Sequence, residues 1–156
     1  MRQRLSEVLG RLYRPPADDV RQVFALSRDD AEKLPRLSSL AIISITAPER
    51  PPACLYGFDY LLRLSFADVD FLKPELSRKA NEKLSRAFTP KQARMVRSFV
   101  EGLPDTITSI VVHCEGGYSR SCAIALGLHR LYGYRVDKES LVRANPSVLS
   151  VMIEGR

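Results

Sequence analysis

The most informative stretch of the sequence covers residues 110–121 and reads IVVHCEGGYSRS. An apolar, β-rich run leads to Cys114, two glycines follow, and Arg120 stands six positions after the cysteine. Glycine lets the backbone approach a ligand closely, so the peptide N–H groups of such a turn can converge on an anion. A helix that begins after the turn adds the positive end of its dipole. The pattern therefore predicts a binding loop for an anion with several acceptor oxygens, such as phosphate.

Cys114 and Arg120 suit two parts of one reaction at such a loop. Converging N–H groups stabilise the thiolate, which is the reactive form of cysteine. The planar guanidinium of Arg120 can donate to two phosphate oxygens at once, which a lysine cannot do. The alternative, that Cys114 is an ordinary core residue, leaves the two glycines and the arginine at this spacing unexplained. One loop thus supplies a nucleophile and a clamp for a phosphoryl group.

The run HCEGGYSRS, residues 113–121, resembles the phosphate-binding loop of the protein tyrosine phosphatase superfamily. Its last five residues are especially similar to those of small dual-specificity phosphatases. The strand expected before the loop and the apolar helix expected after it match as well, and the order of elements resembles that fold over about residues 22–152. The resemblance implies a cysteine-dependent phosphatase that forms a thiophosphoryl intermediate on Cys114 and uses no metal or other cofactor.

The resemblance also implies roles for the rest of the loop. Ser121 stabilises the thiolate as it leaves, and His113 is a supporting residue that orients the loop. The backbone amides and the guanidinium hold the equatorial oxygens of the phosphoryl group. The residues implied to bind phosphate are Glu115, Gly116, Gly117, Tyr118, Ser119 and Arg120.

A general acid is needed as well, because an alkoxide or phenolate is a poor leaving group. In the family this residue is an aspartate on a loop that follows an earlier strand. Here the run YLLRLSF, residues 60–66, predicts a strand, and Asp68 and Asp70 follow it. Asp68 comes sooner after the strand and matches the family position better. Asp70 stays the alternative, because sequence patterns do not locate the end of a strand to the residue.

The elements that must position these residues alternate between apolar runs and helical spacings. Strands are expected at residues 22–26, 40–46, 60–66 and 108–113. Helices are expected near residues 5–12, after Ser27, from Thr89 and over residues 121–132. Such alternation is typical of an α/β domain with crossover helices. The fold class predicted is a single α/β domain, with a mainly parallel central sheet of about four to five strands flanked by helices.

Capping residues predict several helix starts. Thr89 is followed by Pro90 and then by Gln92, three residues after the cap, which is the pattern of a capping box. Asp137 and Asn145 are expected to cap the last two helices. The face of the Thr89 helix that is expected to be buried carries Met95, Val96, Phe99, Val100 and Leu103.

The length and the charge distribution of the chain indicate how it is divided into domains and segments. Its 156 residues suit one phosphatase domain over residues 1–156, with residues 1–20 as an N-terminal helical extension. Residues 71–97 form a basic insertion that holds eight lysines and arginines against two glutamates, the whole net charge of +6. A basic face favours anionic partners, although a solvated helix face has the same composition.

The remaining features concern compartment and substrate. No apolar run approaches the roughly 20 residues that span a bilayer, and the N-terminus does not resemble a secretory signal, so a cytoplasmic location is expected.

The expected partner is a phosphorylated protein or another phosphomonoester, with a phosphate ion bound in the loop and no nucleic acid. Glu115 disfavours highly charged substrates by repulsion, whereas the basic insertion favours them. Alternatives are a phosphoinositide, nucleotide or RNA substrate, a weakly catalytic phosphate-binding module, and a rhodanese-like domain.

Overall fold

Four parallel strands form the centre of the structure, a computed structural model that describes residues 3–154. Their order across the sheet is β1-β4-β2-β3, and each neighbouring pair is parallel. This arrangement confirms the predicted α/β domain with a parallel sheet. The strands are β1 (Gln22–Ser27), β2 (Leu40–Thr46), β3 (Tyr60–Ser65) and β4 (Ser109–Cys114).

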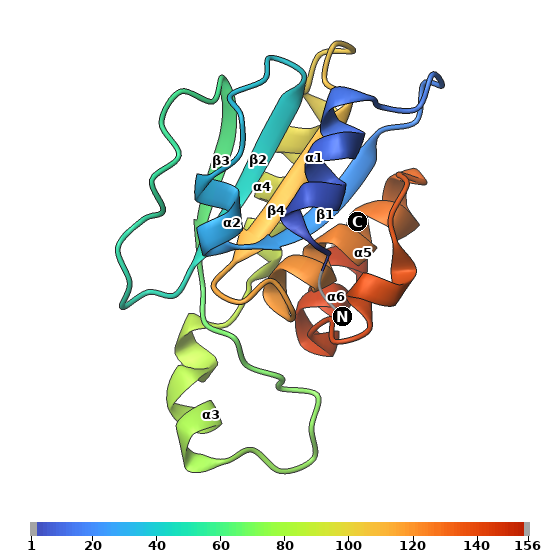
Figure 1. Cartoon of the computed structure of the whole chain (residues 1–156). Helices are drawn as coiled ribbons and strands as arrows, with labels where there is room; N and C mark the ends of the chain where they lie inside the picture. Colours follow the sequence, from blue (N-terminus) through green and yellow to red (C-terminus); the bar gives the residue numbers. More distant parts are fainter. Residues whose placement is uncertain (1–2, 155–156) are drawn as a thin grey trace.

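Helices cover both faces of this sheet (Figure 1). Those on one face are α1 (Leu5–Tyr13) and α2 (Arg28–Glu32), and those on the other are α4 (Pro90–Glu101), α5 (Arg120–Tyr132) and α6 (Pro146–Glu154). Three shorter elements complete the described chain: α3 (Arg78–Lys83) and the 3-10 helices η1 (Leu84–Arg86) and η2 (Lys138–Leu141). None of the helices in residues 3–154 is both long and apolar enough to cross a membrane.

Alternate residues of the strands face two separate cores. Val23 and Ala25 of β1 belong to the larger core, beneath α4, α5 and α6, whereas Phe24 and Leu26 belong to the smaller one, beneath α1 and α2. The central strand β4 is buried along its whole length. Both faces of the sheet are therefore covered, which explains why its strands read as continuous apolar runs.

Helix α5 packs closely against α6 because a glycine lies between them. A Cβ atom at Gly127 would lie only 3.1 Å from the Cβ of Met152. Most of the residues of α5 are buried, as its nearly uniform apolar composition predicted. Close packing against α6 thus holds the helix that follows the loop after β4.

Only part of the basic stretch 71–97 leaves the body of the protein, since residues 90–97 belong to α4 and the preceding residues run between β3 and α4. Its helix α3 has no buried residue and projects away from the sheet (Figure 1). Its base is firmly attached, since the rings of Phe66 and Phe88 lie 4.7 Å apart and the Ala67 N–H donates to the Arg86 carbonyl at 2.7 Å. The insertion is thus a projecting arm (residues 67–88) with an anchored base.

Two local expectations were wrong. Met95 is 40% exposed, and the buried line on α4 is formed by Ala93, Val96 and Val100. Met95 stands one position before Val96, about 100° around the helix, so it turns out of the core. Asp137 stands at the N-cap of the 3-10 helix η2 but makes no side-chain cap, and its carbonyl accepts from the Ser140 N–H at 3.1 Å and the Ser140 Oγ at 2.8 Å. The Thr89 capping box is confirmed.

Candidate active site

The loop that joins β4 to α5 depends on a glycine that tolerates a left-handed conformation. Gly117 has a φ of +78°, and a Cβ atom there would lie 2.6 Å from the backbone nitrogen of Ser27. Any side chain at this position would collide with the end of β1, which is paired with β4 so that Ser27 faces Cys114. Gly117 therefore lets the loop fold back tightly over the carboxyl ends of the strands.

Cys114 is the last residue of β4 and lies at the base of the loop. It is buried, and its Sγ lies 3.1 Å from the Oγ of Ser121 in the first turn of α5. A hydroxyl at this distance can donate to an anionic sulfur. The structure thus brings together the cysteine and the serine that the sequence singled out.

His113 is fully buried and links β4 to β2. Its Nε2 lies 2.6 Å from the Ser44 Oγ, and its Nδ1 lies 3.3 Å from the Cys114 carbonyl oxygen. Burial lowers the pKa of His113 from 6.5 to about 4, so the imidazole is neutral at pH 7. It therefore positions the strand that carries Cys114 and supplies no positive charge to the sulfur.

Arg120 is the first residue of α5, and its guanidinium is hydrogen-bonded to the backbone just after β3. It is only 7% exposed, and its Nη1 donates to the Phe66 carbonyl at 2.9 Å. Its Nε is buried and has no hydrogen-bond partner within residues 3–154. A buried donor without a partner is unfavourable by about 1–3 kcal/mol. An anion in the loop would satisfy it, so this donor set fits a phosphate.

Asp68 lines the same cleft as Arg120. Its side chain is exposed, and its Oδ1 accepts hydrogen bonds from the Ser119 Oγ at 2.9 Å and the Asn145 Nδ2 at 2.8 Å. These two donors leave Oδ2 available to a ligand in the cleft. The structure therefore brings the favoured candidate for the general acid to the mouth of the loop.

Asp70, the alternative, is engaged elsewhere. Its Oδ1 accepts from the Ser147 Oγ at 2.7 Å and from the Leu72 N–H at 3.1 Å, and it does not line the cleft. It therefore helps to attach the loop after β3 to the start of α6.

Asn145 is a site residue whose part sequence reasoning did not foresee beyond its role as a cap. The side chain is buried, and its Oδ1 accepts from the N–H groups of Ser147 and Val148, which caps α6. Its Nδ2 donates to Asp68 and to the Val69 carbonyl, the latter at 3.1 Å. The cap pattern Asn-Pro could be found from sequence, but the contact with Asp68 could not.

The cleft above the loop has a volume of about 760 Å³. Three segments wall it: residues 47–50 after β2, residues 82–86 at the base of the arm, and the loop itself at residues 115 and 120. Asp68 lies among them on the loop after β3. The carboxyl ends of parallel strands thus supply most of the site, as is usual for open α/β sheets.

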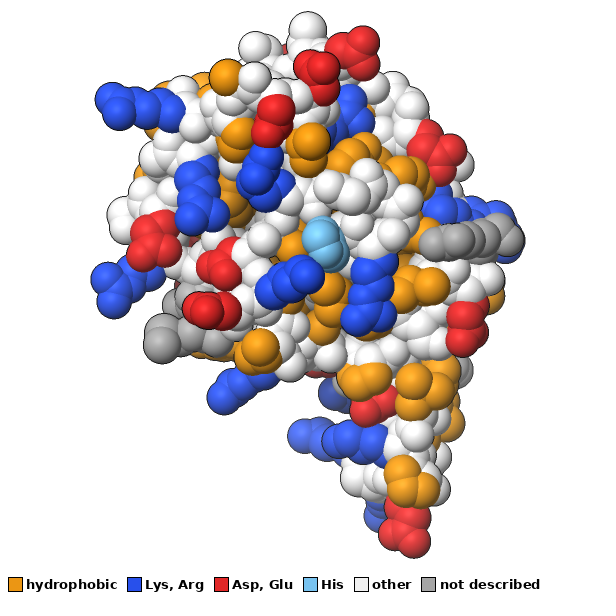
Figure 2. All heavy atoms as spheres, turned by 90° about the vertical axis from the view of Figure 1, so that its right-hand side faces the viewer, with side chains coloured by type: hydrophobic (Ala, Val, Ile, Leu, Met, Phe, Trp, Pro, Cys, Tyr) orange, Lys and Arg blue, Asp and Glu red, His pale blue; other side chains and the backbone are white. Residues whose placement is uncertain are grey.

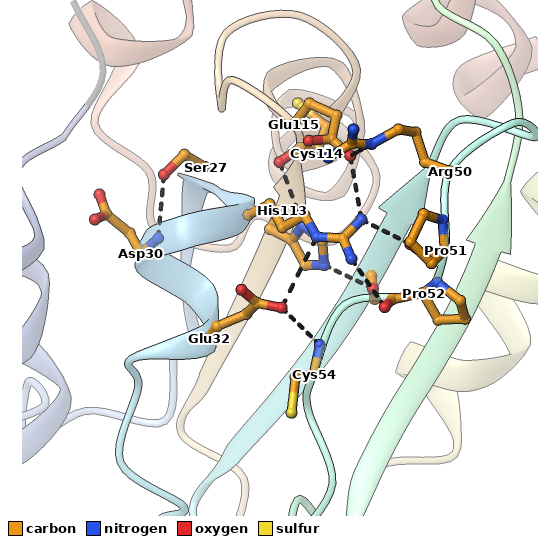
Figure 3. Close-up of polar contacts among 12 residues, drawn as sticks. Ser27, Asp30, Glu32, Arg50, Pro51, Pro52, Cys54, His113, Cys114 and Glu115 are labelled. Carbon is orange, nitrogen blue, oxygen red and sulfur yellow. Dashed lines mark hydrogen bonds and ion pairs between the residues drawn. The ribbon is translucent and has the colours of Figure 1, made fainter.

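Glu115 ties the loop to the neighbouring proline-rich segment (Figure 3). Its Oε1 lies 3.2 Å from the Arg28 Nη1 and 3.5 Å from the Arg50 Nε. Arg28 in turn donates to the carbonyls of Pro51 and Pro52 at 2.7 and 2.9 Å. Two arginines therefore offset the charge of Glu115, which reduces the repulsion of anions expected from the sequence.

The other two cysteines are not paired with Cys114, and all three thiols are free. Cys122 is buried in α5, where burial raises its pKa to about 12. Its Sγ lies 3.4 Å from each of the carbonyl oxygens of Gly117 and Ser140. Cys54 is exposed and its N–H donates to Glu32 at 2.7 Å. Cys122 is thus a core residue of α5.

Tyr118 lies at the rim of the site. Its side chain is 38% exposed, and the Arg143 guanidinium lies 5.5 Å from its ring centroid.

Residues 3–154 contain no cluster of three or more His, Cys, Asp or Glu side chains suited to a metal ion.

Comparisons with known proteins identify the fold. No protein-family profile and no curated protein sequence matches the chain. Among solved structures, human tyrosine phosphatase-like serine/threonine/tyrosine-interacting protein matches with a TM-score of 0.58 and 17% identity, over 88% of this chain and 92% of that one. PTPMT1, alone and in complex with PI(5)P, matches with a TM-score of 0.51 and 18% identity, over 88% and 90%. The chain therefore has the fold of the tyrosine phosphatase-like, dual-specificity proteins.

Proposed function

We propose that the chain is a cysteine-dependent phosphomonoester hydrolase of the protein tyrosine and dual-specificity phosphatase type. The observation that carries the proposal is the buried, unpartnered Nε of Arg120 in the loop that begins at Cys114. A phosphoryl group in this loop satisfies that donor and lies over the sulfur. Asp68 lines the same cleft, which provides the acid that the leaving group needs.

In the first step, the Sγ thiolate of Cys114 attacks phosphorus. The S–P bond forms while the P–O bond to the leaving group breaks, and protonated Asp68 gives its proton to the departing oxygen. Arg120 and the loop N–H groups stabilise the equatorial oxygens throughout. The products are an alcohol or phenol, a phosphocysteine and an Asp68 carboxylate.

In the second step, a water molecule attacks the phosphocysteine. The Asp68 carboxylate takes a proton from the water, the P–S bond breaks, and inorganic phosphate is released. The Ser121 hydroxyl, 3.1 Å from Sγ, donates to the thiolate that departs. The enzyme returns to its starting state, with no metal ion or redox partner in the cycle.

The substrate is a phosphomonoester dianion. A phosphorylated Tyr, Ser or Thr in a protein presents this group, and so does a phosphorylated small molecule or lipid head group. Both classes are compatible with the fold, since one similar protein is named as phosphatase-like and another was crystallised with PI(5)P. Cys114, Arg120 and Asp68 act on the phosphomonoester in the same way in each case.

The test is hydrolysis of a small aryl phosphate by the wild-type protein without added metal. Cys114→Ser should abolish turnover, and Asp68→Ala should lower kcat by about a hundredfold or more when the leaving group is a poor one. Asp70→Asn is the matched control and should keep activity, because Asp70 does not line the cleft.

Three results bear against the proposal in different ways. Wild-type protein that binds vanadate but shows no turnover would be a phosphate-binding module. Activity that survives Cys114→Ser would exclude the phosphocysteine. Loss of activity in Asp70→Asn alone would transfer the role of general acid to Asp70.

A further inference from the structure

Two basic side chains in the wall of the cleft have no ion-pair or hydrogen-bond partner in the described part of the chain. Lys83 is half-buried and Arg86 is exposed, and both line the cleft that holds Arg120. Neither side chain forms an ion pair or hydrogen bond with any residue in the range 3–154. The active-site loop alone does not need them, because Arg120 and the backbone amides already suit one phosphoryl group.

The acidic residues in the same wall offset only part of this positive charge. Glu82 pairs with Arg78 at 3.6 Å, and Glu115 is held by two arginines of its own. Asp68 is bound by Ser119 and Asn145, whereas Glu49, on the loop after β2, forms no ion pair within residues 3–154. Lys83 and Arg86 therefore present two positive charges to the cleft, opposed by the one carboxylate of Glu49.

Arg86 belongs to the anchored base of the projecting arm. Its carbonyl accepts from the Ala67 N–H at 2.7 Å, directly before Asp68, and Phe88 packs on Phe66 close by. Lys83 lies three residues earlier in the same helical run, so both side chains project from one side. The tip of the arm extends beyond them and carries basic, acidic and hydrophobic side chains (Figure 2). The position of Arg86 relative to the general acid is thus determined by the fold.

We propose that Lys83 and Arg86 form a second anion subsite, and that the substrate is a compact bisphosphate. This proposal rests on the proposed function. One phosphomonoester enters the loop at Cys114, and a second phosphate group on the same small scaffold reaches Lys83 and Arg86. Arginine donates to a phosphate through two N–H groups, and lysine adds a point charge. The cleft volume of about 760 Å³ suits a ligand of this size.

The second phosphate can belong to a soluble polyol or to a lipid head group, since both offer the same acceptor oxygens. A phosphotyrosine peptide with uncharged flanks has nothing to offer these two side chains. The paired state of Glu115 supports the proposal further, because no free carboxylate of the loop repels a second phosphate.

The experiment measures binding, so that it does not depend on turnover. Calorimetry gives the Kd of the Cys114→Ser protein for inositol bisphosphate and for inositol monophosphate. We expect the bisphosphate to bind at least about tenfold more tightly at low ionic strength. Adding Arg86→Gln should reduce the ratio of the two Kd values to near one. Lys79→Gln, which removes a positive charge from α3 outside the cleft, should preserve the ratio.

Turnover by the wild-type protein then identifies the source of the bisphosphate. The soluble bisphosphate is compared with phosphatidylinositol monophosphate in phosphatidylcholine vesicles, and a preference for either supports the subsite and assigns its source. Equal Kd values for monophosphate and bisphosphate, a ratio that survives Arg86→Gln, or tighter binding of a neutral-flanked phosphotyrosine peptide would overturn the proposal. A preserved ratio without any hydrolysis of aryl phosphate would retain the subsite and reject the hydrolase.

Discussion

The buried imidazole of His113 shows how a single residue can support the site without taking part in the reaction. Its ring is enclosed between β4 and β2 and lies 2.6 Å from Ser44. Burial strongly disfavours the charged form, which explains the lowered pKa of about 4. The residue therefore keeps the strand before Cys114 in register, and it stays neutral while the cysteine reacts.

This pKa predicts how stability depends on pH. The unfolded chain binds a proton at the ordinary pKa of 6.5, whereas the folded chain does so only near 4. The unfolded state therefore binds more protons between these values, and the free energy of unfolding falls as pH decreases from about 6.5 towards 4. The linkage amounts to about 3 kcal/mol over the whole window.

Urea unfolding at several pH values between 7.5 and 5 tests this prediction. His113→Gln should flatten the decline in unfolding free energy, whatever its effect at neutral pH. His129→Gln, which removes the other histidine of the chain, is the matched control and should retain the decline. An equally steep decline in wild type and His113→Gln would show that other groups cause it.

At the scale of elements, one of the side chains that join the start of α6 to the loop after β3 has two functions. Asn145 caps α6 with its oxygen and holds Asp68 with its nitrogen. The helix start and the position of the candidate acid thus depend on the same amide. A substitution that retains one of these functions and removes the other can separate them.

Two variants of Asn145 make that separation. Serine is a good N-cap but is too short to reach Asp68, whereas alanine loses both contacts. Asn145→Ala should lower stability by about 1 kcal/mol more than Asn145→Ser. Both should slow hydrolysis of substrates with poor leaving groups by about tenfold, because Asp68 keeps only the hydrogen bond from Ser119 and loses the one from Asn145.

Thermal unfolding and a series of aryl phosphates with leaving groups of different pKa measure the two effects. The loss in rate should grow as the leaving group becomes poorer, as for an acid that is out of place. A loss that is the same for all leaving groups would indicate a general disturbance of the site. Full activity in both variants would show that Asp68 needs no support from α6.

For the whole molecule, the two cores on the faces of the sheet contribute differently. The larger core contains α4, α5 and α6 and supports the loop and the cleft, whereas the smaller one includes Val8 and Leu12 of α1. No residue of α1 lines the cleft. The N-terminal helix therefore contributes to stability rather than to chemistry.

Leu12→Ala tests that distinction. The side chain is only 2% exposed, and its loss should lower the free energy of unfolding by about 2–5 kcal/mol. The kcat/KM measured well below the unfolding temperature should not change. Tyr13→Ala, at a neighbouring position that is 62% exposed, should leave both quantities nearly unaltered. Wild-type stability in Leu12→Ala would show that α1 does not hold the sheet.

Much of the fold could be predicted because its signals are local. The ranges of the four strands followed from apolar runs, and the capping box at Thr89 followed from residues three apart. The loop after Cys114 was recognisable because glycine and arginine stand within six residues of it. Met95 and Asp137 were misjudged where the outcome depended on the orientation of a helix or on the choice between two kinds of helix.

By itself, the sequence determined the order of the elements and the loop that can hold an anion, since periodicity, glycine and capping act over short stretches of chain. Only the tertiary structure decided which distant side chains meet there. Asn145 and Asp68 are 77 residues apart in the chain, and Glu115 and Arg28 are 87 apart. Lys83 and Arg86 came to line the cleft because the arm returns to its own starting point, where the Ala67 N–H donates to the Arg86 carbonyl. Contacts of this kind depend on the path of the whole chain, which no local pattern specifies.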